Sequence, residues 1–246
     1  MTGIKRCTAL STSTEMDRWP LWGIPLQIVM EFLVPLPMYI LVCLLFDEPI
    51  LKDRRTNVTC LKQHGYHALA GISVWFWYGM FMLSNRVQHR STADNLSWLV
   101  LHFLLSDGLY YFFHRLCHVR YLYSIHAPHH THKSTPGAKI RMNALSGTCT
   151  HFLDMMITGH LPVFLPCFVT QTPPMWMVGY VIFINFWICA GHSMGRRVGL
   201  FPSMGGLFVT PEVHGRHHIK GRENENFGIL LTVWDRVMGT YSAAGN

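Results

Sequence analysis

Histidines in three short clusters are the residues of this sequence whose types and spacing best suit chemistry. Residues four apart on a helix share one face, with Cβ atoms about 5–6 Å apart, so two imidazoles so placed can hold a metal ion. Imidazole is the commonest metal ligand in proteins and suits iron, zinc and copper. One cluster has the form HxxxH and two have the form HxxHH, namely His114 and His118, then His126, His129 and His130, then His214, His217 and His218. Eight ligands exceed what one ion can hold, so the pattern predicts a site for two metal ions.

Residues outside the clusters could complete such a site. His192, in Gly-His-Ser-Met, is a candidate ninth ligand, although a histidine at a membrane interface would fit equally well. Metal-bound histidines usually donate their second ring N–H to a carboxylate or a carbonyl. Asp107, almost two helical turns before His114, could accept that hydrogen bond, and Glu212 could do the same for His214. An ordinary ion pair is the alternative for both carboxylates.

The elements that position the clusters are predicted to be membrane helices. Half of the 246 residues are hydrophobic and 13% are charged, about half the charged fraction of an average soluble domain. A membrane span needs about 20 apolar residues. Five stretches approach this requirement, at 21–46, 66–84, 96–113, 145–170 and 175–190, and the last two form a hairpin around Pro173 and Pro174. The stretch 145–170 is the least regular, because it contains His151, Asp154 and His160.

The expected fold is an all-α, integral-membrane helical bundle of about four or five spans with a histidine-rich cap. Residues 1–20 are expected to form a tail, 21–95 the N-terminal spans, and 96–246 the domain with the clusters, including the hairpin at about 145–190. Charge predicts the orientation, because placing all clusters on one side gives that side 15 of the 20 Lys and Arg residues. Positive residues mark the cytoplasmic side of a membrane, so the cap is expected to face the cytoplasm.

Several function classes are disfavoured. The formal charge of +7 includes no continuous Lys/Arg run, so nucleic-acid binding is not expected. The seven cysteines include no CxxC pair, which argues against a disulfide framework or a cysteine–zinc site. A serine hydrolase is not expected, and neither is a zinc protease, because HExxH is absent. No GxGxxG nucleotide motif is present either, so electrons for a redox reaction would have to come from a separate carrier.

The three clusters, in this order and with a membrane hairpin between the second and the third, resemble the fatty acid hydroxylase/sterol desaturase superfamily. Two later motifs, Glu225-Asn-Phe-Gly228 and Trp234-Asp-Arg-Val-Met-Gly-Thr240, are similar to the ending of that superfamily. The resemblance covers residues 96–241. It implies a catalytic domain with a non-haem diiron centre held by the eight clustered histidines. His192 matches a further family histidine, and Asn226 is a candidate to hold the ligands in place.

The resemblance also implies an activity. Members use dioxygen and reducing equivalents to hydroxylate or desaturate lipids, so a sterol, fatty acyl or sphingoid lipid is the expected substrate. The expected electron donor is cytochrome b5 or a similar carrier with its reductase, and the expected membrane is the endoplasmic reticulum. A membrane metal-binding or transport protein, a catalytically silent scaffold, and isomerase or aldehyde-forming chemistry stay open as alternatives. Transport would favour polar residues at the bilayer midplane, whereas the clusters lie at the span ends and beyond.

Overall fold

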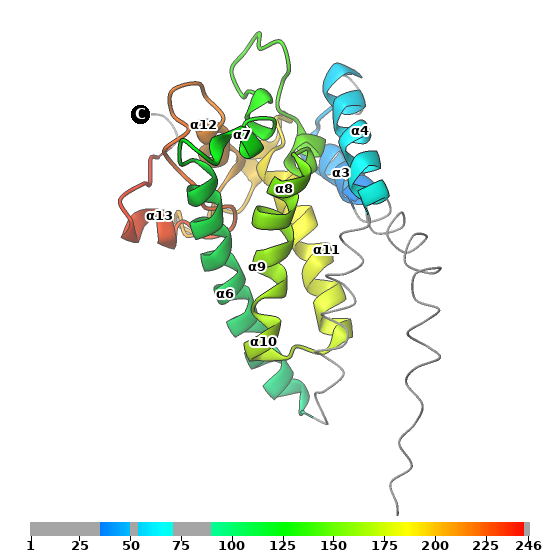
Figure 1. Cartoon of the computed structure of the whole chain (residues 1–246), viewed down its shortest axis with the longest axis vertical. Helices are drawn as coiled ribbons and strands as arrows, with labels where there is room; N and C mark the ends of the chain where they lie inside the picture. The colour runs from blue at the N-terminus through cyan, green and yellow to red at the C-terminus, as the bar shows by residue number, and fades with distance from the viewer. Residues whose placement is uncertain (1–34, 50–53, 71–89, 244–246) are drawn as a thin grey trace, which may run out of the picture.

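The structure, a computed structural model, describes residues 35–49, 54–70 and 90–243. These residues are helical apart from loops and two isolated β-bridges, which confirms the all-α prediction. Long apolar helices form a shaft, and short helices joined by loops form a cap at one end of it (Figure 1). Every histidine of the three clusters lies at the end of the shaft that carries the cap or within the cap.

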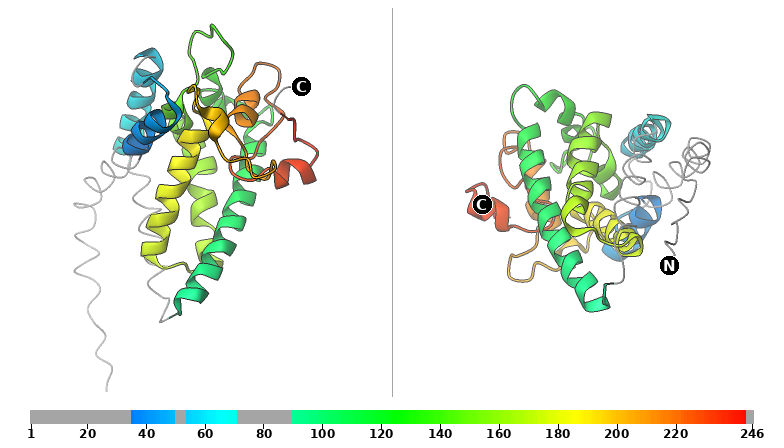
Figure 2. Two further views of the ribbon diagram at one scale, coloured as in Figure 1. Left: turned by 180° about the vertical axis from the view of Figure 1, so that it is seen from behind. Right: turned by 60° about the horizontal axis from the view of Figure 1, so that its bottom comes forward.

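Three rods make up the shaft, and the second of them in the sequence runs antiparallel to the other two (Figure 2). They are α6 (Thr92–Cys117), an arm composed of α8 (Phe152–Asp154), η4 (Met155–His160), α9 (Leu161–Phe164) and α10 (Cys167–Thr170), and α11 (Pro174–Gly191). The α6 helix begins after Ser91, whose side chain accepts a hydrogen bond from the Asp94 backbone N–H and so satisfies a free donor of the first turn. The predicted hairpin is present, and its turn contains Gln171 in the left-handed region (φ 46°) and Pro174 at the start of α11.

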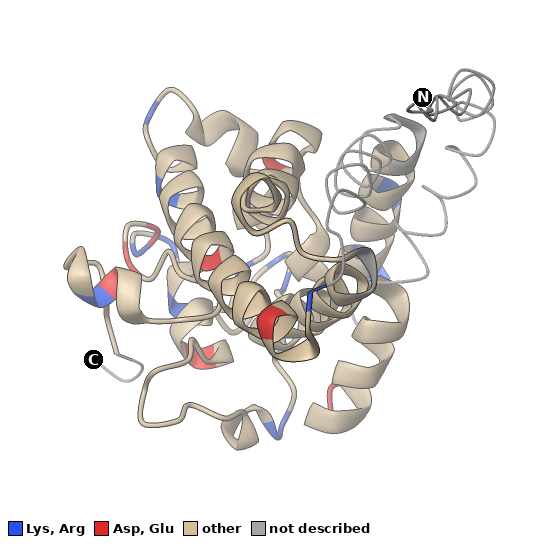
Figure 3. Ribbon diagram, turned by 90° about the horizontal axis from the view of Figure 1, so that it is seen from below, with Lys and Arg blue, Asp and Glu red and all other residues tan. Residues whose placement is uncertain are grey.

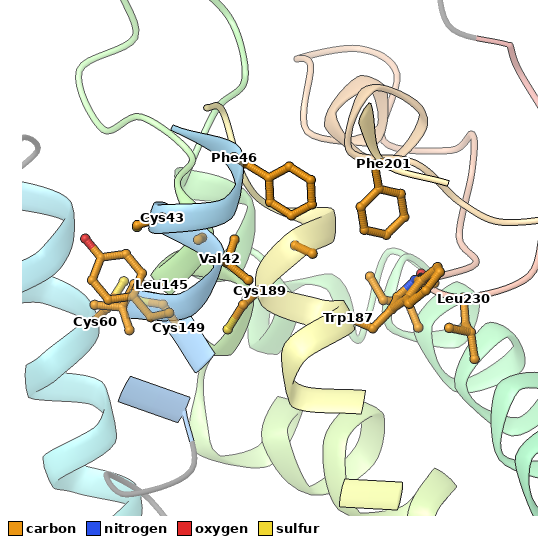
Figure 4. Close-up of a cluster of buried hydrophobic side chains, with 14 residues drawn as sticks. Val42, Cys43, Phe46, Cys60, Leu145, Cys149, Trp187, Cys189, Phe201 and Leu230 are labelled. Atoms are coloured by element: carbon orange, nitrogen blue, oxygen red, sulfur yellow. Dashed lines mark hydrogen bonds between the residues drawn. The ribbon is translucent and has the colours of Figure 1, made fainter. Parts of the chain in front are cut away.

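The cap consists of helices too short to be stable on their own in water. They are α7 (Tyr123–His126), η2 (His129–Thr131), η3 (Ala144–Thr148), η5 (Val198–Leu200), α12 (Pro211–His217) and α13 (Val233–Val237). Tertiary contacts must therefore hold them, and the main apolar cluster lies where the cap meets the shaft (Figure 4). Trp187 of α11 anchors this cluster, because its ring packs on Phe201 and its indole N–H donates to the Ile229 carbonyl at 3.0 Å.

Two further helices flank the shaft, α3 (Pro35–Phe46) and α4 (Arg54–Ala70). The α3 helix packs on α11 and contributes to the same apolar cluster. Most of α4 precedes the predicted span 66–84, and its last residues fall within the start of that span. A stripe of polar side chains with helical spacing is buried on one face of α4, namely Thr56, Asn57, Cys60, His64 and His67. Because that stripe is polar, apolar periodicity could not reveal the helix.

Membrane-type helices are present among the described residues. Thr92–Cys117 and Phe152–Thr170 are long and apolar enough to cross a bilayer, and Pro35–Phe46 and Trp176–Gly191 are shorter apolar helices. Large apolar side chains are exposed along them, for example Leu96, Val100, Leu104, Phe168 and Ile182. Seen from the end opposite the cap, these helices carry few charged residues (Figure 3). Apolar surface of this extent on long helices is typical of contact with lipid.

One boundary of the predicted spans changes. The arm begins at Phe152 rather than near residue 145, because Asn143 and Ser146 cap the short helix η3 and keep residues 144–148 in the cap. The predicted spans at 21–46 and 66–84 lie partly outside the described residues, so the expected total of four or five spans stays a prediction. The orientation of the cap relative to the two sides of a membrane also stays a prediction.

Candidate metal centre

Nine histidines gather in two adjacent groups in the cap. The first, called the five-histidine group, contains His114, His118, His126, His130 and His217, and the second, called the four-histidine group, contains His129, His192, His214 and His218. Within each group the candidate ligand atoms lie within 4.8 Å of one another. All nine are buried except His118, which is partly exposed. The structure thus brings together all eight clustered histidines and the candidate ninth, His192.

Ring nitrogens face one another at the centre of each group. In the five-histidine group, His114 Nε2 lies 3.0 Å from His126 Nε2 and 3.1 Å from His217 Nε2. In the four-histidine group, His192 Nε2 lies 3.0 Å from His214 Nε2 and 3.3 Å from His129 Nε2. The Nε2 atoms therefore converge, as ligands around an ion do.

The opposite ring nitrogens point outward to acceptors. Six of the nine histidines place Nδ1 against an oxygen that can only accept, namely His114 on Phe227 O, His126 on Asp154 Oδ2, His129 on Cys149 O, His192 on Ile188 O, His217 on Glu225 O and His218 on His132 O. Each Nδ1 must carry the proton, which leaves the Nε2 lone pair free and directed inward. This tautomer is the one that metal-ligating histidines adopt.

The converging nitrogens require a cation. Neutral rings in this tautomer would face one another with lone pairs only about 3 Å apart, which is repulsive unless a proton or a metal ion lies between them. Protonation is opposed, because desolvation by burial and then the neighbouring histidines lower the pKa of His129, His214 and His217 well below the ordinary value. Burial likewise lowers the pKa of His192 to about 4. The residues present therefore fit a pair of metal ions.

Local structure explains how each ligand reaches its place. His114 lies in the last turn of α6 and His118 caps the end of that helix, so both rings lie on one side of a long rod. His192 caps the C-terminus of α11. The α12 helix starts with Thr210, whose side chain accepts from the Val213 N–H, and with Pro211 in the first turn, and its remaining residues carry the third cluster.

Asp154, which interrupts the predicted span 145–170, is a partner of the histidines that their spacing does not indicate. Its carboxylate accepts a hydrogen bond from His126 Nδ1 at 2.8 Å, and both side chains are almost fully buried. The hydroxyls of Thr150 and Thr158 also donate to this carboxylate. Directly after Asp154 the backbone forms the π-helix η4, and such irregular turns are frequent at functional sites. Asp154 therefore holds the His126 ring in the ligating orientation.

The motifs near the end of the sequence orient two further ligands through the backbone. The carbonyls of Glu225 and Phe227 accept from His217 and His114 at 2.7 and 2.6 Å. Asn226 lies between them with a φ of 54°, and its side chain bonds Val213 O and both the N–H and the carbonyl of Ser242. The Asp235 carboxylate accepts from the N–H groups of Phe227 and Gly228. Asn226 thus acts by fixing the chain that carries both carbonyls.

The two predicted carboxylate partners lie elsewhere. Asp107 accepts from the Leu231 N–H at 3.3 Å, whereas the His114 Nδ1 proton goes to the Phe227 carbonyl. Glu212 is exposed in the first turn of α12, and His214 Nδ1 has no hydrogen-bond partner among the described residues. Helical spacing suggested the first pair, but the Phe227 carbonyl takes the place of Asp107 as the acceptor for His114.

Residues 191–195 read Gly-His-Ser-Met-Gly and match the GxSxG pattern of serine hydrolases by their letters. The structural context differs, because this segment follows the end of the apolar helix α11 instead of a strand. Ser193 is fully buried and its hydroxyl donates to Glu48 Oε2 at 2.8 Å. The serine is therefore a structural residue and not an exposed nucleophile.

A largely apolar cavity leads to the two histidine groups. It lies between α6, the arm and α11, and its walls include Val163, Phe164, Val181, Ile184 and Ile188. His126, His129 and His192 also line it, so both groups contact the same space. His160, one of the polar residues within the predicted span 145–170, lines the cavity as well. An apolar cavity with a few convergent polar groups is the usual form of a binding site for a small apolar ligand.

The fold and the site define a class of protein. It is a helical protein with apolar helices suited to contact with lipid, and with two adjacent histidine groups that fit metal ions. The sequence profile described as fatty acid hydroxylase matches residues 99–240, more than half of the chain. The chain belongs to the fatty acid hydroxylase family.

Curated relatives show what proteins of similar sequence do. A very-long-chain aldehyde decarbonylase of Oryza sativa subsp. indica is 28% identical over 54% of this chain and 22% of its own length. One from Arabidopsis thaliana is 27% identical over 54% of this chain and 21% of its own length. A methylsterol monooxygenase of Arabidopsis thaliana is 28% identical over 61% of this chain and 50% of its own length. The chain thus spans only about a fifth of the decarbonylases, and no solved structure matches it.

Proposed function

We propose that this protein is a membrane-bound non-haem diiron oxidoreductase that uses dioxygen to hydroxylate or desaturate a lipid. The observation that carries the proposal is the convergence of ring nitrogens from nine histidines in two adjacent groups that share one apolar cavity. Family membership and the similarity to a methylsterol monooxygenase support it. A sterol, a fatty acyl chain and a sphingoid lipid are the candidate substrates.

The nine histidines would hold two iron ions, and bound iron would supply the activation of dioxygen. The contribution of the protein follows from its own residues. The side chains of α9 and α11 exclude water from the cavity and offer apolar contacts to a hydrocarbon chain. Asp154 and the backbone carbonyls keep a proton on the outer ring nitrogen of the six histidines that they contact, so that the inner nitrogens of these rings stay available as ligands.

The partners and the location belong to the same proposal. We expect electrons from cytochrome b5 or a similar carrier with its reductase, because the sequence contains no GxGxxG nucleotide motif. We expect the membrane to be the endoplasmic reticulum with the cap in the cytoplasm, which the distribution of Lys and Arg supports.

A second candidate reaction is the removal of the carbonyl carbon from a long-chain aldehyde. The similarity to plant very-long-chain aldehyde decarbonylases favours it, and it would use the same groups and the same cavity. A membrane metal-binding or transport protein is less well supported, because six of the nine histidines have ordered outer partners and the nine do not form a path along the shaft.

Metal analysis and lipid oxidation test the proposal together. Protein purified in detergent should contain iron at about two ions per chain, the number that two ligand groups would hold. His129→Ala and His217→Ala, one from each group, should abolish product formation with iron-loaded protein and electron donor. His151→Asn is the matched control, because His151 caps α8 outside both groups.

Comparing the lipids of cells with and without the gene should reveal one accumulating precursor. An accumulating lipid with an unmodified C–H position supports hydroxylation or desaturation, whereas an accumulating aldehyde supports the second candidate. Full turnover by a metal-free preparation would refute both.

A further inference from the structure

A third group of ligand-type side chains lies next to the metal centre but belongs to neither histidine group. It consists of Cys60, His132 and Cys149, whose candidate ligand atoms lie within 4.8 Å of one another. All three side chains are buried, with exposed fractions of 0%, 1% and 2%. Cys60 and Cys149 come from segments far apart in the sequence and lie side by side at the edge of the apolar cluster (Figure 4).

The geometry of this group suits a thiophilic metal ion. Cys60 Sγ lies 3.8 Å from His132 Nε2. In a tetrahedral zinc site, with Zn–S of about 2.3 Å and Zn–N of about 2.0–2.1 Å, sulfur and nitrogen ligands lie about 3.6 Å apart. His132 Nδ1 donates to the His129 carbonyl at 3.1 Å, so its proton is on the outer nitrogen and Nε2 faces the sulfur atoms. This is the tautomer that the ligands of the two histidine groups adopt.

The other buried cysteines provide a contrast. Cys43, Cys117, Cys167 and Cys189 are as well buried, yet none belongs to a group of possible metal ligands among the described residues. Cys167, for example, lies near the Val163 carbonyl of the preceding turn and behaves as a small apolar residue. Burial alone therefore does not bring cysteine and histidine together in this protein, and the Cys60–His132–Cys149 group requires its own explanation.

We propose that Cys60, His132 and Cys149 form a third metal site, which binds one thiophilic ion, zinc(II) or copper(I). Two thiolates and one imidazole favour these ions over calcium, magnesium or manganese, which prefer oxygen ligands. A cysteine–metal site was not expected from the sequence, because no two cysteines have the CxxC spacing of metal ligands. The fold places ligands from residues 60, 132 and 149 together without any such spacing.

The position of the site indicates its role. Cys60 belongs to α4, whereas His132 and Cys149 end the short helices η2 and η3 of the cap. The carbonyls of these same two residues orient ligands of the four-histidine group, because Cys149 O accepts from His129 and His132 O accepts from His218. A metal ion here would fix α4 to the cap and hold both carbonyls in place. It is therefore a positioning site and not part of the reaction.

Metal analysis of the full-length wild-type protein in detergent is the primary test. We expect about one zinc or copper ion per chain in addition to iron, with zinc and copper measured separately. X-ray absorption at the edge of that metal should show two sulfur neighbours at about 2.3 Å and nitrogen at about 2.0 Å. Absence of both metals, or a spectrum with only nitrogen and oxygen neighbours, would overturn the proposal without any variant.

Variants locate the ion. Cys60→Ser and Cys149→Ser should each lower the zinc or copper content per chain at least tenfold. The amount of iron bound by the five-histidine group should change less than twofold. Cys167→Ser is the matched control and should retain the wild-type content of all metals. An unchanged zinc or copper content in both variants, or a Cys60–Cys149 disulfide in protein purified under reducing conditions, would exclude the site. The result does not depend on the proposed lipid oxidation, because iron and product are measured independently.

Discussion

The two histidine groups hold their ligands by different means. Two ligands of the five-histidine group come from the long helix α6, and a third, His126, is fixed by the buried carboxylate of Asp154. The ligands of the four-histidine group come from a helix end and from short cap helices. Its outer hydrogen bonds go to backbone carbonyls, and His214 Nδ1 has no partner among the described residues.

This difference indicates unequal tasks for the two proposed ions. Five ligands leave few open positions on an ion, and the carboxylate on His126 makes that ring a stronger donor. Four ligands leave more open positions, and His129 and His192 of the smaller group line the cavity. We therefore expect the five-histidine group to retain its ion firmly and the four-histidine group to be more exposed to small molecules from the cavity.

Removing one ligand from each group should give the largest contrast. We expect His214→Ala to abolish activity and to lose about half of the iron, because only three histidines remain in its group. His118→Ala leaves four histidines and should keep most of the iron, with partial activity. Iron content per chain and product formation measure both effects. Equal iron loss in the two variants would remove the proposed difference between the groups.

Replacing the carboxylate should have the next largest effect. Asp154→Ala removes the acceptor of the His126 ring proton, and loss of such an outer partner typically costs about 10–100-fold in metal affinity or activity. Iron retention during dialysis against a chelator, with activity before and after, measures it. Thr158→Val removes only one hydroxyl bond to the same carboxylate and is the milder comparison. If Asp154→Ala retained iron as well as the wild-type protein does, the carboxylate would not explain why the five-histidine group holds its ion firmly.

Narrowing the cavity should alter substrate use and leave the metals unchanged. Ile184 lines the cavity, so Ile184→Phe should reduce turnover of a bulky lipid by about tenfold. Ile182 lies on the exposed face of the same helix, and Ile182→Phe should have no effect. Rates with substrates of graded size measure the change. A similar loss in both variants would mean that the substrate does not occupy this cavity.

The smallest expected effect concerns the segment that supports the five-histidine group. Asn226→Ala removes buried side-chain hydrogen bonds to Val213 and Ser242 in a left-handed backbone conformation, at a cost of about 1–3 kcal/mol in the free energy of unfolding. Iron retention in the five-histidine group should fall slightly. Thermal unfolding of detergent-purified protein measures the first effect. Asn226→Gly also loses the side-chain hydrogen bonds, but glycine adopts the left-handed conformation without strain. Comparing the two variants therefore separates backbone strain from the lost hydrogen bonds.

The sequence predicted the ligands because their spacing is local, but it did not predict how they divide. Pairs four apart stay together, as His126 with His130 and His214 with His218 show, because they lie on one face of a turn. The residue directly before His130 or His218 points about a quarter turn away, so His129 and His217 enter the opposite group. This rule is contained in the HxxHH pattern, although counting histidines alone does not reveal it.

The partners of the ligands were harder to predict, because they depend on contacts between distant segments. Asp154 interrupted an apolar stretch, and such an interruption in a predicted span was itself a signal of function. The carbonyls of Glu225 and Phe227 have no signature in residue type, since any residue can offer a backbone oxygen. The α4 helix escaped detection because its buried face is polar and bonds to the cap through Thr148 and the Thr150 carbonyl.

The carbonyls of Glu225 and Phe227 have a consequence for how the protein is made. The ribosome releases α6 and both early histidine clusters long before the segment that orients His114 and His217 exists. Folding follows synthesis from the N-terminus, so α6 and the hairpin can enter a membrane while the ligand set is still incomplete. The five-histidine group can reach its final form only after α13, which contains Asp235, has been translated. Loading of the five-histidine group with its proposed ion would therefore be a late event, and a stop codon shortly before residue 225 should yield an inserted protein whose five-histidine group does not retain a metal ion.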